Sequence, residues 1–246
     1  MKKVERERLK HNEAADAVAA ASLFVAAHGR SLLLGGVALV VLAAAVLGYL
    51  AWRERTEERA QAMLAAAVDT ANQPVQQADL LLDEGAEAPV FATEAERLDA
   101  VIGQLMATAD AYPSTDAGIQ ARYYAASLLA DANRLDAAAG AFEDVRQRAG
   151  RSITGRMATL GLASVQVRAG NYDPAIRTFE ELATGGGDLP VDGVLMHLAD
   201  AYVHAGRQTE AVEALRRIVN EFPQSPYASE ARQRADTLQA DIAKAS

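Results

Sequence analysis

Hydrophobic and polar positions divide the chain into two parts with different patterns. Residues 31–52 contain no charged side chain and are mainly Leu, Val, Ala and Gly, with Arg30 and Arg53 on either side. After this run, helical stretches alternate with Gly, Asn and Pro positions up to the C-terminus. The pattern predicts one long apolar helix followed by a series of paired helices.

The uncharged run has the length of a membrane-spanning helix. Its 22 residues would form a helix about 33 Å long, close to the roughly 30 Å hydrocarbon core of a bilayer. Tyr49 and Trp52 lie at its end, where amphipathic rings favour the interface. A cleaved signal peptide has an apolar stretch of only about 7–15 residues and a small-residue cleavage site, which bulky Trp52 and the following Arg-Glu-Arg do not provide. We therefore expect an uncleaved anchor rather than a signal peptide or a buried core helix.

Basic residues are more numerous before this run than directly after it. Six Lys or Arg precede it, and three, at positions 53, 55 and 59, follow it closely. Because Lys and Arg are retained on the cytoplasmic side, the N-terminus is predicted to be cytoplasmic and the C-terminal domain to lie across the membrane. Residues 13–28 are predicted to form a short helix before the span, either an interfacial docking element or an ordinary juxtamembrane helix.

The C-terminal half repeats itself every 36 or 37 residues. Three alanines align in this register, and each is followed four positions later by a large apolar residue; the pairs are Ala138 with Phe142, Ala175 with Phe179, and Ala211 with Leu215. Pro113 and Pro223 are separated by 110 residues, which equals two spacings of 37 and one of 36. One register therefore relates several independent positions.

Helix geometry gives these positions a physical meaning. A Gly or Asn between two helical runs adopts the left-handed conformation that ends the first helix. An alanine early in the second helix lets the two backbones approach, and the large residue four positions later fills the space between them. A following proline ends the second helix. Each pair leaves an apolar face that only the next pair covers, so the pairs must stack.

These positions resemble the tetratricopeptide repeat (TPR), with a small residue in the first helix, a turn glycine, an Ala and an aromatic in the second helix, and a closing Pro. The small first-helix position and the residue three places later are occupied by Ala126 and Leu129, Ala163 and Gln166, and Ala199 and Tyr202. The spacing exceeds the usual 34 residues, Asn133 replaces one turn glycine, and Gln166 is polar where an apolar residue is usual. The resemblance covers about residues 94–235.

The expected fold class is all-α, with a single transmembrane helix followed by an α-solenoid of TPR-like helix pairs. We expect a cytoplasmic segment at 1–30, the transmembrane helix at 31–52 and the repeat domain at 53–246. The repeat domain would contain a divergent repeat at 54–113 with an insertion at 73–93, repeats at 119–150, 156–187 and 192–223, and a capping helix at 226–243.

The layout is similar to that of the YfgM-type family, the ancillary subunit of the bacterial SecYEG translocon. The features that match are a short N-terminal helix, His28-Gly29-Arg30 before the span, Trp52 near its end, and a TPR-like domain after it. This resemblance implies a single-pass protein of the bacterial inner membrane with a periplasmic domain. Residues 221–228, Glu-Phe-Pro-Gln-Ser-Pro-Tyr-Ala, instead resemble repeats of envelope-assembly and division-coordinating TPR proteins.

Composition and charge exclude other classes of function. Half of the residues are hydrophobic but only 5% are aromatic, which suits closely packed alanine-rich helices. Residues 1–30 carry six basic and four acidic residues, so the rest of the chain carries 18 basic and 29 acidic residues, a net charge of −11. Phosphates would be repelled, so nucleic-acid binding is not expected. The chain has no cysteine for disulfides or a zinc site.

No catalytic or cofactor motif is found in the sequence. The chain has four histidines and lacks a Gly-x-Ser-x-Gly elbow, a phosphate-binding loop and a His-Glu-x-x-His motif. His197, Asp200 and His204 would share a helix face, but the two histidines would lie about 10 Å apart along the axis, too far for one ion. We predict that the protein is not an enzyme and has no cofactor or metal site.

The predicted functional surface is a protein-binding groove lined by the first helix of each repeat. The residues that would line it are partly polar and partly apolar, and they lack the basic cluster that clamps a peptide carboxylate. One hypothesis is a translocon-associated or chaperone-like module that binds the translocon or periplasmic clients. The other is a structural subunit or assembly scaffold of an envelope complex. The candidate residues are Gln120, Tyr123, Ser127, Asp131, Met157, Leu160, Ser164, Arg168, Met196, Asp200 and His204.

Overall fold

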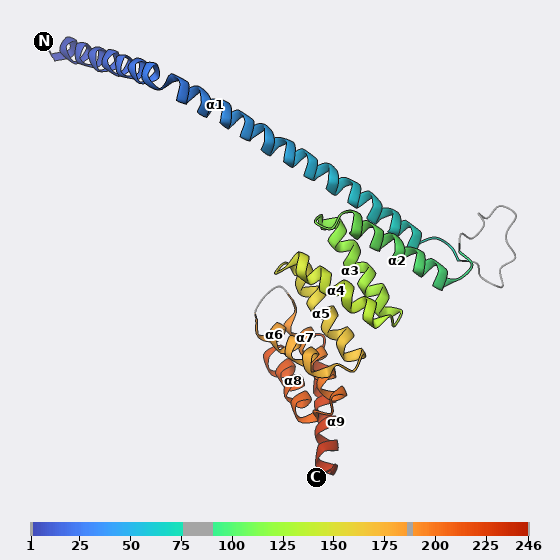
Figure 1. Cartoon of the computed structure of the whole chain (residues 1–246). Coiled ribbons are helices and arrows are strands. Elements are labelled where there is room, and N and C mark those ends of the chain that lie inside the picture. The colour runs from blue at the N-terminus through green and yellow to red at the C-terminus, as the bar shows by residue number, and fades with distance from the viewer. Residues whose placement is uncertain (1, 76–90, 186–188, 246) are drawn as a thin grey trace. The chain divides into compact units, whose positions relative to one another are not determined.

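A computed structural model describes residues 2–75, 91–185 and 189–245 of the chain. The regular structure of these residues is helical, and their β-type pairing is limited to an isolated bridge between Val75 and Phe91 (Figure 1). The all-α prediction is therefore confirmed. The chain forms two compact units, Met1–Arg55 and Thr56–Ser246.

The first unit consists of the N-terminal part of α1 (Lys2–Ala71). The sequence predicted a separate short helix at 13–28, but α1 runs through this region without a break. The difference has a simple reason, because isolated glycines weaken a helix by only about 1 kcal/mol and no proline occurs before Pro74. Apolar side chains from Leu33 to Trp52 are exposed, between 49% and 69% for the large ones. Among the described residues, α1 contains the one helical segment long and apolar enough to cross a membrane; it lies within Leu33–Ala71, and its most apolar stretch has a mean hydropathy of 2.5.

The second unit contains the rest of α1 and a series of helices of similar length. Each helix of this series packs against the next in the chain, and α3 also packs against α5 and α5 against α7 (Figure 1). This order of contacts is that of an α-solenoid. The helices are α2 (Glu94–Ala111), α3 (Asp116–Asp131), α4 (Leu135–Ala149), α5 (Ile153–Arg168), α6 (Tyr172–Thr184), α7 (Val191–His204), α8 (Gln208–Glu221) and α9 (Ala228–Ala245).

The turns within the helix pairs adopt the predicted left-handed conformation. Asn133, Gly170 and Gly206 have φ angles of 59°, 80° and 75°. At each turn the residue that follows donates its backbone N–H to a carbonyl five residues earlier, at 2.8 Å; the donors are Arg134, Asn171 and Arg207. These bonds satisfy the last carbonyls of the first helix. Asn133 thus replaces glycine without a change in turn geometry, since Asn tolerates this region better than most residues.

The helices α2 and α8 end where the sequence predicts. Tyr112 and Phe222 are the C-cap residues of α2 and α8, so Pro113 and Pro223 lie directly after the two helices as predicted. The hydroxyl of Thr115 caps α3 by accepting from the N–H of Gly118 at 3.0 Å. The predicted insertion at 73–93 lies mostly outside the described residues, because 76–90 are not described. Residues 186–188 of the loop after α6 also lie outside the described residues.

The core lies between the helices and uses the repeated positions. Ala126, Ala163 and Ala199 are fully buried, which lets neighbouring helices approach closely. The large apolar positions are buried as well, with Phe142, Phe179 and Leu215 exposed by 3%, 1% and 0%. The predicted register of the core is therefore confirmed.

Candidate protein-binding surface

The predicted first-helix residues lie on α3, α5 and α7, which are neighbours in the solenoid. Five members of the set are exposed and available to a partner: Gln120, Asp131, Met157, Arg168 and His204. Arg168 donates to the amide oxygen of Asn133 at 3.2 Å and so links α5 to the turn between α3 and α4. This part of the set forms a mixed polar surface with one exposed methionine.

Five members of the set are half-buried, and four of them, Tyr123, Ser127, Leu160 and Ser164, take part in packing. The Tyr123 ring lies edge-on to Phe142, with 5.7 Å between centroids, and burial raises the pKa of Tyr123. The hydroxyls of Ser127 and Ser164 donate to carbonyls one turn earlier, those of Tyr123 and Leu160. Leu160 packs against the core of the C-terminal repeats. These side chains stabilise the unit, and part of each remains exposed to a partner.

Met196 has a different environment from the one expected. We expected its side chain to be a surface contact, but it is only 9% exposed and belongs to the main core cluster. The reason is that α7 packs against α5, α6 and α8, so little of its surface is left open. Met196 is therefore a packing residue in this structure.

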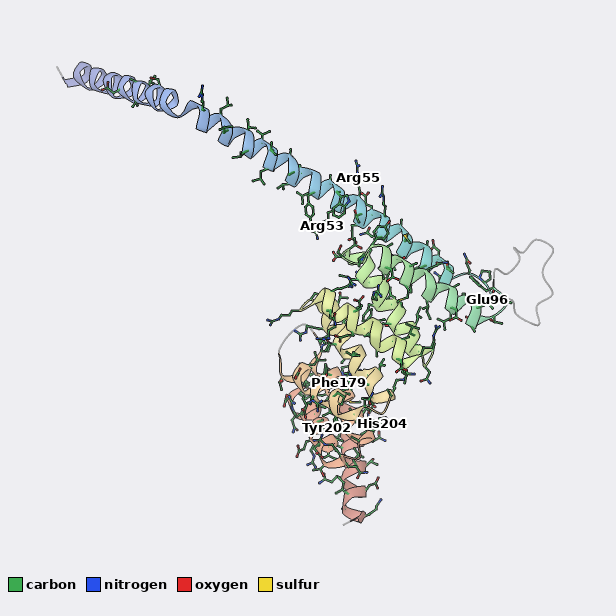
Figure 2. The ribbon with its side chains drawn as sticks, in the orientation of Figure 1. Arg53, Arg55, Glu96, Phe179, Tyr202 and His204 are labelled. Carbon is green, nitrogen blue, oxygen red and sulfur yellow. The ribbon has the colours of Figure 1, made fainter. Side chains whose placement is uncertain are left out.

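The His197, Asp200 and His204 positions do not gather around one point. His197 stacks on Phe179 and His204 stacks on Tyr172, with centroids 5.9 Å and 6.2 Å apart, while the Asp200 carboxylate pairs with Arg234. Phe179 and His204 are labelled in the C-terminal part of the repeat unit in Figure 2. In the described parts of the chain, no three His, Asp or Glu side chains are placed to hold a metal ion. Each of the three side chains thus has a structural contact of its own.

An apolar groove lies where the C-terminal end of α1 meets α2 and α3. Its volume is about 300 Å³. Val68 and Tyr124, 47% and 46% exposed, are its large open side chains, and Ser127 is the member of the predicted set that lines it. Asn72 and Ser127 provide its side-chain polar groups apart from the Tyr124 hydroxyl. The lining residues are Ala67, Val68, Ala71, Asn72, Val101, Leu105, Tyr124, Ser127 and Leu128.

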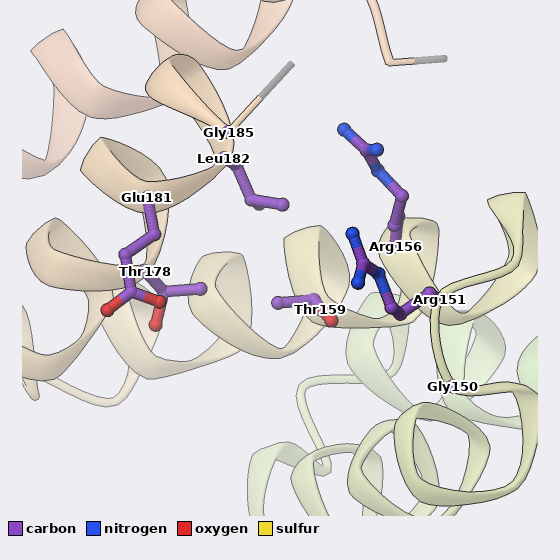
Figure 3. A pocket seen from close by; sticks show the side chains of 8 residues that line it. All are labelled: Gly150, Arg151, Arg156, Thr159, Thr178, Glu181, Leu182 and Gly185. Atoms are coloured by element: carbon purple, nitrogen blue, oxygen red, sulfur yellow. The ribbon is translucent and has the colours of Figure 1, made fainter. Parts of the chain in front are cut away.

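A second, more polar pocket of about 360 Å³ lies between the start of α5 and the end of α6. Arg151 and Arg156 extend along one side of it, and Thr178 and Glu181 face them from α6 (Figure 3). Its lining thus includes two guanidinium groups and one carboxylate. No residue of the predicted set lines this pocket.

A third pocket, of about 160 Å³, contains a buried tyrosine next to acidic side chains. The Tyr202 hydroxyl donates to the carboxylate of Glu180, and the Arg207 guanidinium lies 4.8 Å from the Tyr202 ring centroid. Burial and this hydrogen bond raise the pKa of Tyr202 to about 12. The arrangement holds α6, α7 and the following turn together.

The sequence did not predict the apolar groove. Val68 and Ala71 belong to the first helix pair, which the insertion at 73–93 interrupts, so no repeat register assigned them. A usable signal was present in Tyr124, a large side chain that remains exposed in the middle of α3.

Comparison with known families and structures agrees with this architecture. Residues 23–186 match the model described as a tetratricopeptide repeat-like domain, and residues 194–225 match a tetratricopeptide repeat. No curated protein matches the chain. The two matches together extend from within α1 to the end of α8.

Two solved structures that match the chain have little sequence in common with it. A crystal structure of a variant of nearly identical TPR-like repeats, from a Podosopora anserina protein assigned as a kinesin light chain, superposes with a TM-score of 0.52 at 14% identity. The match covers 77% of this chain and 97% of the other. A second crystal structure of these repeats gives a TM-score of 0.49 at 14% identity, over 76% and 97% of the two chains. The first likeness shows the shared fold alone.

Proposed function

Because the chain belongs to the tetratricopeptide repeat-like domain family, whose repeats generally mediate protein–protein interactions, we propose that it is a membrane-anchored interaction module of the bacterial cell envelope. The observation that carries the proposal is an exposed apolar helix in the same chain as a TPR-like solenoid. In this proposal residues 31–52 span the inner membrane and the repeat domain at 53–246 lies in the periplasm.

The partner surface in this proposal is the first-helix face of the solenoid. Its exposed side chains on α3 and α5, with His204 on α7, are its contacts, and Met196 is left out because it is buried. TPR-like folds are typically non-catalytic scaffolds, so we propose no enzymatic activity. A role beside the SecYEG translocon or in binding periplasmic clients rests on the resemblance to the YfgM type. A scaffold with one permanent partner is the second candidate.

Site-specific photocrosslinking in cells tests the proposed surface. A photoreactive amino acid is placed at Gln120, Asp131 or Met157 on the first-helix face, and at Gln147 on the exposed side of α4 as a matched control. We expect protein crosslinks from the first three positions and few from the fourth. Equal crosslinking from all four positions would contradict a preferred surface. One abundant product supports a scaffold, and many weak products support a chaperone-like role.

The orientation has its own test. A reporter that is active only outside the cytoplasm, fused after Ser246, is expected to be active because more basic residues precede the span than follow it. Activity of a cytoplasm-only reporter at that site would place the repeat domain in the cytoplasm.

A further inference from the structure

We propose that the apolar groove between α1, α2 and α3 binds a basic, amphipathic protein segment by receiving its apolar side chains. This inference rests on the proposed interaction function and specifies one ligand class and one location for it. The inference names the chemical class of the bound segment and does not require a particular partner protein.

The groove is chemically suited to apolar side chains. Val68, Ala71, Val101, Leu105 and Leu128 are among its apolar lining residues, and its volume of about 300 Å³ is at the lower end for ligand pockets. No Asp, Glu, Lys or Arg lines it. An uncharged hollow of this size fits one or a few anchoring side chains of a segment whose remainder stays outside.

Two exposed large apolar side chains, Val68 and Tyr124, line the groove. The other large apolar side chains that are more than a third exposed in the described repeat unit are Met63, Ile153, Met157 and Tyr227. Met63 lies four residues before Ala67, on the same side of α1. Large exposed apolar groups are costly in water, and a partly exposed tyrosine is a frequent anchor in protein interfaces.

The charge of the helices around the groove indicates which sign of charge the bound segment carries. Residues 56–131 contain three arginines and 13 acidic residues, a net charge of −10, whereas residues 132–246 contain 13 basic and 15 acidic residues, a net charge of −2. Even within the described residues of 56–131, nine acidic residues stand against the three arginines. The negative charge of the repeat unit is therefore concentrated in the helices that form the groove.

Two exposed carboxylates belong to the helices that form the groove and are close in sequence to its lining residues. Asp131 follows Ser127 and Leu128 by four and three residues, so it shares their side of α3. Asp69 lies near the end of α1, three residues before Asn72. Two of the arginines in this region are already paired, Arg97 with Glu94 at 2.6 Å and Arg122 with Asp144 at 2.7 Å. Lys or Arg side chains beside an apolar anchor would complement the carboxylates of Asp69 and Asp131.

Binding of short peptides to the full chain in phosphatidylcholine nanodiscs tests the proposal, with empty discs subtracted. The first peptide combines leucine with lysine, the second replaces lysine by glutamate, and the third replaces leucine by alanine. We expect the leucine–lysine peptide to bind at least about tenfold more tightly than either of the others, and more weakly at high salt. Absence of binding by this peptide, or equal binding by all three, would overturn the proposal.

Variants of exposed groove residues locate the site. Val68→Ser with Tyr124→Ser is expected to weaken leucine–lysine binding about tenfold, and Asp69→Asn with Asp131→Asn to reduce its salt dependence. The matched control is Ile153→Ser with Tyr227→Ser. These residues are 42% and 40% exposed and lie outside the groove, so the variant should bind the leucine–lysine peptide normally. Equal binding by the groove variant and the control overturns the proposal.

Two further outcomes separate this inference from related ideas. If the full chain sediments as a dimer that Val68→Ser with Tyr124→Ser makes monomeric, a second copy fills the groove and the proposal is wrong. If photocrosslinks at Gln120 and Met157 persist while the peptide does not bind, the interaction function stands and only the groove assignment fails.

Discussion

The ring of Phe142 lies directly against Gly161 of the following repeat. A β-carbon built at Gly161 would come within 2.7 Å of both Cε1 and Cζ of this ring. Phe142 is 3% exposed and belongs to a core cluster, so its ring is enclosed by other side chains. In the next repeat the corresponding contact is a stack of Phe179 on His197, at 5.9 Å. Gly161 therefore permits the close approach of α4 and α5.

The first prediction concerns this contact. Gly161→Ala is expected to lower the free energy of unfolding by about 1–3 kcal/mol, since it overpacks a filled space. Gly140→Ala on α4 is the matched control, because nothing lies within 4 Å of a β-carbon there. That change should stabilise the helix by roughly 0.5–1 kcal/mol. Denaturant unfolding followed by circular dichroism measures both, and equal effects would contradict the packing argument.

A second prediction tests the core position at the centre of the solenoid. Phe179 is 1% exposed and belongs to the largest core cluster. Phe179→Ala is expected to cost about 3–5 kcal/mol, because it removes a buried ring and leaves a cavity. Phe179→Leu should cost less than half as much. A loss below about 1 kcal/mol for the alanine variant would mean that the ring is not needed for packing.

Glu57 joins α1 to the start of α3. Its two carboxylate oxygens accept from the backbone N–H groups of Asp116 and Ala117, each at 2.9 Å. These N–H groups belong to the first turn of α3, where a negative charge is favourable. The third prediction is that Glu57→Ala destabilises the repeat unit by about 1–2 kcal/mol.

Thermal unfolding of a fragment covering 56–246 measures this effect. We expect the fragment to be soluble, helical and cooperative, since its core clusters lie within these residues. Glu58→Ala, at an exposed neighbouring carboxylate, is the control and should change stability by less than about 0.5 kcal/mol. A Glu57 variant as stable as the Glu58 variant would show that the cap is dispensable.

The repeated positions were predictable from sequence because they depend on local geometry. A left-handed turn at Gly170, an alanine five residues later and a bulky residue four after that determine which faces meet. These positions led directly to the buried Phe142, Phe179 and Leu215. The fold class followed because stacking is the simplest way to cover the faces of such pairs.

The binding surface was less predictable because exposure depends on distant neighbours. The repeat register placed Met196 in the same position as the half-buried Tyr123 and Leu160, yet packing of α7 on three helices buries it. The groove and the Glu57 cap both join residues of α1 to helices beyond the insertion, separated by up to 61 residues. No local pattern relates such residues, so only the folded arrangement identifies them.

The last prediction concerns alkaline pH and follows from Tyr202. In the folded protein, burial and the hydrogen bond to Glu180 raise the pKa of Tyr202 to about 12, against about 10 in the unfolded chain. The folded state therefore favours the neutral phenol, and this contribution to stability is complete below pH of about 10 and is lost as the pH rises towards 12. Allowing for solvent screening, the loss is on the order of 1–2 kcal/mol.

Ultraviolet absorbance of tyrosinate should reveal a late-titrating group that is missing in Tyr202→Phe, and unfolding measured across this pH range should be less pH-dependent in the variant. Tyr227→Phe, at an exposed tyrosine, is the control and should retain both the late titration and the pH dependence. If Tyr202→Phe titrates and unfolds like this control, the hydroxyl is not held by Glu180 in solution.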